Sequence, residues 1–363
     1  MGISIRHHEH VMIKRKVTKT INIGGIKVGG LEPVSVQSMT KTDTRDIEKT
    51  VAQIKSLENM GCEIVRLAIP DEKAVKAFSE IKKKVRIPLV ADIHFDYRLA
   101  TGSIRAGADC IRINPGNIGG KEKITLVVNE AKAREIPIRI GINSGSIEKD
   151  ILEKYGHPTP EAMVESVLRH IEIMEDLNFY SLKLSLKSSD VMDTVEAYRI
   201  ISSKTDYPLH LGITEAGSSL AGTVKSSIGL GILLSEGIGD TIRVSLTAPP
   251  EEEVLAGYEI LRTLGLREKN IEIISCPTCG RCEVNLFDLV KEIKEKTNHI
   301  NKPLVIAIMG CVVNGPGEAR EADLGIACGK GSCVIFRKGE IYKKVKEEDM
   351  AGVLLEEILK ATE

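Results

Sequence analysis

Tryptophan is absent from this chain of 363 residues, and five phenylalanines and seven tyrosines are its only other large aromatic side chains, so we expect an aliphatic core. A charge imbalance is also missing, because 50 basic residues oppose 51 acidic ones. No overall field therefore draws the protein onto nucleic acid or an anionic membrane. No stretch of about 18 apolar residues occurs, and the first residues lack the apolar core of a signal peptide. We expect a cytosolic protein with no nucleic-acid or membrane partner.

Cysteine is scarce in the first three quarters of the chain. Only Cys62 and Cys110 precede residue 276, and we expect both to be buried and inert. The other six of the eight cysteines fall in the last 88 residues: Cys276, Cys279, Cys282, Cys311, Cys328 and Cys333. In a reducing cytosol, clustered thiols persist as metal ligands or reactive groups more readily than as disulfides. The skew predicts a large body followed by a smaller module that binds a metal.

Short β-rich runs alternate with longer helical patterns over the first two thirds of the chain. After a hairpin-like stretch, TINIGGIKVGG, the eight candidate strands cover residues 33–39, 63–69, 88–94, 109–114, 137–143, 182–187, 209–214 and 241–246. Between them lie helical patterns with one apolar stripe. Eight strand–helix units favour a (β/α)8 barrel of the TIM type. An open doubly wound sheet is the alternative, but no dinucleotide fingerprint supports it.

The regular alternation of expected strands and helices ends near residue 265. Short strands are expected at IEIIS, LVIAIM, LGIA, CVIFR and IYKKV, and helices at about 283–296 and 347–361. This pattern is typical of an α+β domain. We therefore expect a TIM-type barrel over residues 1–264 and a smaller α+β domain over residues 265–363.

Charged and polar residues recur on or just past the later residues of the expected strands, where a barrel builds its active site. They are Arg66, Asp92, His94, Arg112, Asn114, Arg139, Asn143, Lys187, Glu215, Arg243 and Ser245. Within a strand a two-residue spacing keeps side chains on one face, so Asp92 and His94 project together. Five cations and only two carboxylates would converge on one mouth.

Such an excess of positive charge requires a counter-anion, and arginine forks match phosphate oxygens. We infer a small substrate that carries more than one phosphate. Taken singly, each residue is equally consistent with a solvated strand end or a loop salt bridge. Glu215, in GITEAG, is the notable carboxylate: a bound polyanion would raise its proton affinity and suit it to general-acid work. Its plainer interpretation is a structural partner for Lys187 or Arg243.

The segment CPTCGRC carries three cysteines at two successive C-x2-C spacings, which suits thiolates wrapped around one cluster or metal ion. Cys311, in MGCVVNGPGEA, is a candidate for a distant fourth ligand. The spacing favours an iron–sulfur cluster, and structural zinc is the alternative. The GPGEA turn would project Glu318 near the same site as a labile oxygen ligand, although on spacing alone a solvated loop glutamate is the favoured interpretation.

At these residues the chain resembles the bacterial two-domain family of 4-hydroxy-3-methylbut-2-enyl diphosphate synthases, which act late in the methylerythritol phosphate route to isoprenoids. The motifs that carry the resemblance cover nearly the whole chain: PVSVQSMT, ADIHFDYRLA, IRINPGNIG, IRIGINSGS, LHLGITEAG, DTIRVSLTA, SCPTCGR and GCVVNGPGEA. The resemblance implies a 4Fe-4S cluster held by Cys276, Cys279, Cys311 and Glu318. It also implies a barrel that binds 2-C-methyl-D-erythritol 2,4-cyclodiphosphate.

The resemblance also implies roles for the barrel residues. Glu215 would protonate the departing hydroxyl, and Asp92 and His94 would belong to the substrate pocket. Residues that would hold the diphosphate are Arg66, Arg112, Arg139, Lys187 and Arg243, helped by Asn114, Asn143 and Ser245. Two electrons would arrive through the cluster from reduced flavodoxin or ferredoxin. The family is a homodimer in which the cluster domain of one chain closes over the barrel of the other.

Cys282 departs from the family pattern, because its position suits a fourth thiolate. The family assigns that place to Glu318, and we follow the family since four thiolates would close the iron site. Other functions weighed are a zinc-stabilised barrel hydrolase or lyase acting on a sugar phosphate and a carrier of phosphate or cluster without catalysis. A radical enzyme using S-adenosylmethionine is disfavoured because its three cysteines belong in the barrel.

Overall fold

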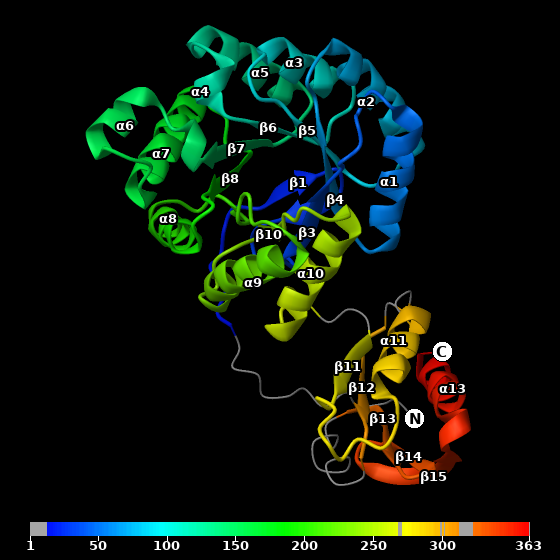
Figure 1. Cartoon of the computed structure of the whole chain (residues 1–363). Helices are drawn as coiled ribbons and strands as arrows, with labels where there is room; N and C mark the ends of the chain where they lie inside the picture. Colours follow the sequence, from blue (N-terminus) through cyan, green and yellow to red (C-terminus); the bar gives the residue numbers. More distant parts are fainter. Residues whose placement is uncertain (1–12, 268–270, 298–299, 301, 312–321, 363) are drawn as a thin grey trace. The chain divides into compact units, whose positions relative to one another are not determined.

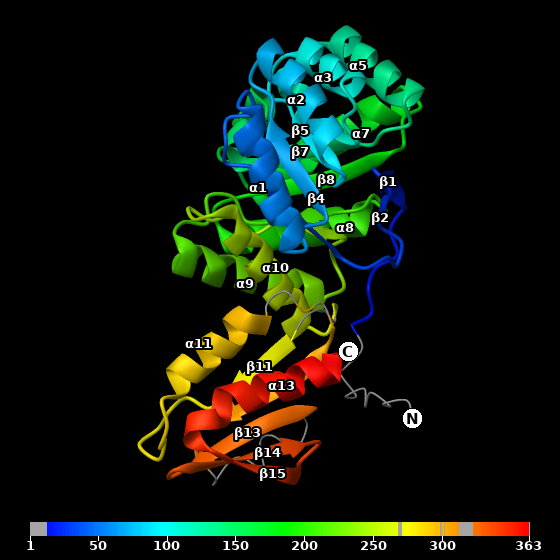
Figure 2. The same cartoon turned by 90° about the vertical axis from the view of Figure 1, so that its right-hand side faces the viewer.

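The computed structural model describes residues 13–267, 271–297, 300, 302–311 and 322–362. The chain divides into two compact units, Met1–Arg267 and Glu268–Glu363. The first unit is a parallel barrel ringed by helices and the second an α+β sheet domain (Figures 1 and 2). The predicted fold class is confirmed.

Eight parallel strands form the barrel, in the order β8-β7-β6-β5-β4-β3-β10-β9. A parallel bridge between Leu184 and Leu209 joins the two ends of this order, so the sheet closes. The strands are β3 Ser35–Met39, β4 Ile64–Ala68, β5 Leu89–Asp92, β6 Cys110–Ile113, β7 Ile138–Asn143, β8 Leu182–Lys187, β9 His210–Leu211 and β10 Thr241–Ile242. Each lies within one of the eight predicted runs.

Helices follow the strands and cover the outside of the barrel. The long ones are α1 Ile47–Asn59, α2 Glu72–Lys84, α3 Tyr97–Arg105, α5 Lys121–Ala133, α7 Pro160–Asp176, α8 Val191–Lys204, α9 Ser219–Ser235 and α10 Pro250–Thr263. Short turns α4 Pro115–Ile118, η1 Ser144–Ser146 and α6 Lys149–Tyr155 lie between them. Side-chain caps start several helices: Asp71 accepts a hydrogen bond from the Ala74 N–H (2.9 Å), which satisfies a backbone donor that the helix leaves free.

The main core lies between the strands and the helices and is mostly aliphatic, as the composition predicts. Val65 and Leu67 of β4 and Ile111 and Ile113 of β6 pack there with the helices. Because side chains alternate along a strand, the residues between them point into the barrel. The hairpin of β1 Ile21–Ile23 and β2 Ile26–Val28 packs on the first residues of the strands and covers the N-terminal end of the barrel.

The second unit is a five-stranded sheet in the order β11-β12-β13-β14-β15, in which β11, β12 and β13 are parallel and the last two pairings are antiparallel. Its elements are β11 Ile271–Ser275, α11 Leu286–Thr297, β12 Leu304–Met309, β13 Leu324–Gly329, β14 Ser332–Arg337, β15 Glu340–Lys346, η2 Glu347–Asp349 and α13 Met350–Thr362. Both helices contribute to one aliphatic core with the sheet. The predicted strands and helices of this unit are confirmed.

Candidate active site

The interior of the barrel is lined by charged side chains where such barrels normally hold Val, Ile and Leu. The strand register pairs Asp92 with Arg112, Arg112 with Arg139, and Arg139 with Lys183 on successive strands. The inward residues of alternate strands share a level in this kind of barrel. Followed from strand to strand around the barrel, the residue pairs place Arg66, Arg112 and Arg243 at one level along the barrel axis, which we call the arginine layer.

The next level toward the N-terminal end of the barrel is also polar. Gln37 of β3, Arg139 of β7 and His210 of β9 share it, and Lys183 of β8 lies one level further. We call these four residues the inner cluster. Arg139 was expected near a strand end, but it is the second residue of β7 and is 1% exposed. Its depth follows from the barrel's stagger, which a single strand does not reveal.

Asp92 is the carboxylate that faces the arginine layer. Its oxygens lie 3.7 Å from Arg66 Nε, 3.4 Å from Arg112 Nη1 and 3.4 Å from His94 Nε2. Burial alone would raise the pKa of Asp92, but the charges of Arg66 and Arg112 and the His94 hydrogen bond outweigh it, so the pKa is lowered. Asp92 therefore stays ionised and holds two of the arginines.

Two glycines make room for cationic heads inside the barrel. A Cβ at Gly141 would collide with the guanidinium of Arg112, and a Cβ at Gly212 would collide with Lys187 Nζ. The head groups of Arg112 and Lys187 thus lie across neighbouring strands. Arg112 Nη2 also donates to the Gly141 carbonyl (3.0 Å), which fixes the plane of its guanidinium.

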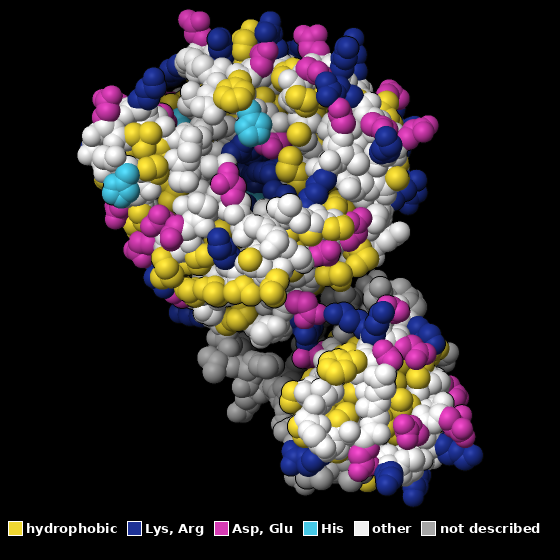
Figure 3. All heavy atoms as spheres, in the orientation of Figure 1, with side chains coloured by type: hydrophobic (Ala, Val, Ile, Leu, Met, Phe, Trp, Pro, Cys, Tyr) yellow, Lys and Arg dark blue, Asp and Glu magenta, His cyan; other side chains and the backbone are white. Residues whose placement is uncertain are grey.

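Positive charge is concentrated and poorly compensated in this interior. Burial, reinforced by neighbouring cations, lowers the pKa of Arg139 and of Lys187 well below their ordinary values, and lowers that of Arg243 to about 10. Among the described carboxylates, none lies within ion-pair distance of Arg139, Lys183 or Lys187. Figure 3 shows the barrel face hollowed near its centre, with Lys and Arg side chains lining the hollow.

Glu253 is a site residue that the sequence did not single out. It comes from α10 and accepts hydrogen bonds from the Leu246 N–H (3.0 Å) and Ser38 Oγ (3.1 Å). The same carboxylate lies 3.0 Å from Lys41 Nζ and 3.4 Å from Arg243 Nη2. Glu253 stands in the first turn of a helix rather than at a strand end. The only signal in the sequence is a run of three glutamates there, which by itself marks a favourable helix start.

The remaining predicted residues lie at the loops that follow the strands. Asn114 is buried, accepts from the Gly116 N–H (3.1 Å) and donates to the Ser146 carbonyl (3.1 Å), so it joins two mouth loops. Asn143 ends β7, and His94 and Ser245 continue the inward faces of β5 and β10.

Glu215 is exposed and has a backbone φ of +51°, a left-handed conformation that is costly for a non-glycine residue. Within the described part of the chain it forms no ion pair with Lys187 or Arg243.

The cysteines of the second unit gather at one edge of its sheet. Strands β11 and β12 are parallel neighbours, so the loops that follow them, carrying Cys276 and Cys311, start side by side. The Gly310 N–H donates to Cys276 Sγ (3.3 Å), and a Cβ at Gly310 would collide with Cys282 Sγ. Hydrogen bonds from the Arg281 backbone and side chain lower the pKa of the exposed Cys279 thiol, which favours the thiolate.

The cysteine loops of the second unit suit an iron–sulfur cluster by the chemical type of the ligands that they offer. Thiols and a backbone N–H that donates to sulfur suit such a cluster. Within the described residues no three of these side chains already stand in a metal-binding group. The predicted fourth ligand, Glu318, lies outside the described residues.

The other four cysteines are not in these loops. Cys62 and Cys110 are buried, as expected, and burial raises the pKa of Cys62 to about 12. Cys328 and Cys333 form a disulfide, contrary to the expectation of free thiols. Its cause is the register, which places the two residues directly opposite each other on β13 and β14.

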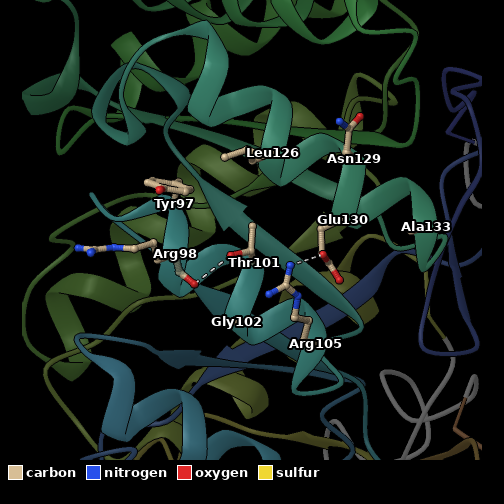
Figure 4. Close-up of a pocket in the computed structure, with 9 residues that line it drawn as sticks. All are labelled: Tyr97, Arg98, Thr101, Gly102, Arg105, Leu126, Asn129, Glu130 and Ala133. Atoms are coloured by element: carbon tan, nitrogen blue, oxygen red, sulfur yellow. Dashed lines mark hydrogen bonds and ion pairs between the residues drawn. The ribbon is translucent and has the colours of Figure 1, made fainter.

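A hollow of about 510 Å³ lies outside the barrel between α3 and α5 (Figure 4). Arg105 turns toward Glu130 there and donates to it (2.8 Å), whereas Arg98 extends away. Arg98 pairs instead with Asp96. The charges of this hollow are therefore compensated, whereas those of the barrel interior are compensated only in part. Among the described helices, none is long and apolar enough to cross a membrane.

Comparison with known proteins gives relatives that match nearly the whole chain. It is 61% identical over 349 residues to a 4-hydroxy-3-methylbut-2-en-1-yl diphosphate synthase (flavodoxin) of Thermodesulfovibrio yellowstonii, with 96% of this chain and 100% of the relative covered. A protein of the same name from Caldanaerobacter subterraneus is 62% identical over 350 residues, with coverages of 96% and 99%.

Among solved structures, a type I 3-dehydroquinate dehydratase from Clostridium difficile has a TM-score of 0.50 at 16% identity. The likeness covers 69% of this chain and 98% of that one and shows a shared fold alone. Residues 18–258 match the GcpE TIM-barrel domain and residues 272–360 match the GcpE protein C-terminal domain. The resemblance found in the motifs is thus confirmed, and the chain belongs to the GcpE family.

Proposed function

We propose that this chain reduces 2-C-methyl-D-erythritol 2,4-cyclodiphosphate to 4-hydroxy-3-methylbut-2-enyl diphosphate. The proposal rests on the names of relatives at about 60% identity together with the cationic interior of the barrel. The observation that carries it is the arginine layer, because its three largely buried guanidiniums have only two described carboxylates within ion-pair distance, Asp92 and Glu253. A doubly charged diphosphate would supply the missing negative charge.

The barrel residues would bind and orient the diphosphate. Asp92 fixes Arg66 and Arg112, so their remaining N–H groups are directed before the substrate arrives, which reduces the entropy lost on binding. The groups that would donate to phosphoryl oxygens are Arg66, Arg112, Arg139, Lys187 and Arg243, with Asn114, Asn143 and Ser245 nearer the loops and His94 beside Asp92. Removal from water makes each of these hydrogen bonds stronger than on the surface.

Glu215 would deliver the proton that lets the substrate hydroxyl leave as water. It stands in the turn after β9, its carboxylate is exposed, and no described residue pairs with it. A bound diphosphate nearby would favour its protonated form, which is the form a general acid needs. The strained φ of +51° is consistent with a side chain held for function rather than for stability.

The second unit would hold a 4Fe-4S cluster through Cys276, Cys279, Cys311 and Glu318. When bound, such a cluster supplies electrons one at a time at low potential. The chain's own part is to present thiolates: Arg281 stabilises that of Cys279, and the Gly310 N–H donates to Cys276. Cys282 would be a spare thiol near the cluster.

The proposal assigns residues 1–264 to substrate binding and residues 265–363 to the cluster. Electrons would come from reduced flavodoxin, as the printed names of the relatives suggest, or from ferredoxin. We further propose a cytoplasmic homodimer in which the cluster domain of one chain closes on the barrel of the other. In that arrangement Glu318 would also act beside the substrate.

Anaerobic purification with iron, sulfide and zinc analysis, followed by turnover of the cyclic diphosphate with reduced flavodoxin, tests the function. We expect four irons and four sulfides per chain, no stoichiometric zinc, and formation of the linear diphosphate only with reductant. A colourless, zinc-containing protein that acts on a sugar phosphate without reductant would instead establish the hydrolase.

A further inference from the structure

The inner cluster has no partner for most of its polar atoms. Gln37, Arg139, Lys183 and His210 are each at most 1% exposed. Among the described residues, no hydrogen-bond partner exists for Gln37 Nε2 and Oε1, Arg139 Nε and Nη1, Lys183 Nζ, or either ring nitrogen of His210. Leaving one such group unsatisfied costs about 1–3 kcal/mol. Four of them at neighbouring levels of one barrel indicate that something other than the protein satisfies them.

Other buried polar groups close to the inner cluster are paired, as at Tyr198 and Asp240. The Tyr198 hydroxyl donates to the His210 carbonyl (2.5 Å) and accepts from the Leu186 N–H (3.1 Å). Asp240 accepts from the Leu209 N–H (2.9 Å) and from Thr18 (3.0 Å). Unpaired buried atoms also occur elsewhere, at Ser103 and Ser226 and at the Nε atoms of Arg112 and Arg243, but among the described residues only the inner cluster gathers seven of them on four inward side chains at neighbouring levels. This concentration marks a local site rather than a generally poor core.

The sign of the charge selects the class of ligand. Arg139 and Lys183 are register neighbours on β7 and β8, and no described carboxylate pairs with either. Above them stands the arginine layer, with Asp92 and Glu253 as its only described ion-pair partners. Burial lowers the pKa of Lys183 to about 8 and that of His210 well below its ordinary value, so a neutral imidazole is also available. Donors in excess of negative charge suit an oxyanion.

We propose that the inner cluster is a second anion subsite, at the two levels below the arginine layer, which binds a phosphoryl group through Arg139, Lys183, Gln37 and His210. This subsite rests on the proposed function, because the phosphoryl group would belong to the bound diphosphate. Free inorganic phosphate has the same chemistry and is the other source. Because the arginine layer lies between the mouth and the inner cluster, a phosphoryl group that enters from the mouth would pass Arg66, Arg112 and Arg243.

The subsite predicts opposite effects of one substitution on stability and on binding. Lys183→Met keeps the length of the side chain and removes an unpaired buried charge. In phosphate-free buffer we expect the full chain to unfold about 2–4 °C higher. If Lys183 had a merely structural role, Lys183→Met would instead lower the midpoint temperature of unfolding. His210→Phe keeps an aromatic ring and removes both ring nitrogens. It is the second variant for the same unfolding and binding measurements.

Binding is measured by titration calorimetry with inorganic phosphate and, separately, with pyrophosphate. We expect Lys183→Met to weaken phosphate binding by about tenfold, which is the contribution of one charge-assisted hydrogen bond. Lys225→Met, on the exposed side of α9, is the matched control and should bind both anions as the wild type does. Arg66→Met reports on the arginine layer and should weaken pyrophosphate binding.

The two anions distinguish the sources and the proposals. Weaker binding of both by Lys183→Met indicates that the subsite serves the diphosphate, and weaker binding of phosphate alone indicates free phosphate as its ligand. Unchanged binding of both, with Arg66→Met still impaired, overturns the subsite and leaves the proposed function intact. Failure of the wild type to bind pyrophosphate at all overturns the proposed diphosphate site as well.

Discussion

The barrel and the C-terminal unit place their chemistry at different depths. In the barrel, the charged groups stand on strands and point into the core: Arg139 is 1% exposed and Lys183 is fully buried. In the C-terminal unit the core is aliphatic, and the thiols lie in loops beyond the sheet, with Cys279 exposed. Strands fix a side chain more tightly than loops do. The barrel is therefore suited to hold an anion in one geometry, and the cysteine edge to accept a group from outside.

The comparison also separates two kinds of cost. Cations inside the barrel lower the stability of the empty protein and are retained for binding. The thiols at the sheet edge cost little stability when no cluster is bound, because Cys276 and Cys282 lie close to Gly310 and their loop is partly exposed to solvent. Substitutions in the barrel should thus change both stability and anion binding, and substitutions at the cysteine edge should change cluster content and activity but not stability.

The largest expected effect comes from Cys279→Ser. Because Cys279 is exposed, the fold should persist, while cluster content falls and turnover drops by more than about 10³-fold. Iron analysis and a turnover assay measure this, and pyrophosphate binding by the barrel should be unchanged. Cys282→Ser is the matched control and should keep both iron and activity. Loss of both in Cys282→Ser together with full activity in Glu318→Ala would show that Cys282 is the fourth ligand.

A smaller effect is expected for Glu215→Gln. Removing the acid should lower kcat by about 10²–10³-fold, within the usual contribution of general acid catalysis, with little change in KM. Steady-state kinetics across pH measures it. Glu135→Gln is a matched control, because Glu135 has a similar φ of +55° but precedes β7, away from the mouth loops. A change in KM alone would identify Glu215 as a binding group instead.

The smallest effect is expected for Asp92→Asn, measured as the free energy of unfolding in urea. Leaving Arg66 and Arg112 without their carboxylate should cost about 3 kcal/mol. The pKa of Asp92 is lowered in the folded protein, so its contribution is complete above the ordinary value of 3.8 and is lost as the pH falls below it. The difference between wild type and variant should therefore shrink in acid. Asp43→Asn, at an exposed pair with Arg45, should show a smaller loss. A constant difference down to low pH would contradict the assignment.

Much of the fold could be predicted from periodicity. All eight barrel strands lie in predicted runs, because alternating apolar residues mark a strand between two layers. Depth within the barrel could not be predicted, since it depends on the stagger of neighbouring strands. Arg139 is accordingly deeper than expected, and Lys183 and His210 were overlooked although both alternate with apolar neighbours in LKLSLK and LHLGIT. That alternation was the signal available for them.

The sequence by itself determined the barrel, the α+β unit, the set of cations and the clustered cysteines, because each depends on local pattern and residue type. Only the tertiary structure decided which of these groups meet. It brought Glu253 from α10 to Arg243, set Cys276 beside Gly310, and paired Cys328 with Cys333. Contacts of this kind join residues far apart in sequence or fixed by strand register, and their geometry follows from packing rather than from any single segment. The inner cluster is the clearest case: four residues from four strands meet at two neighbouring levels only because the sheet closes.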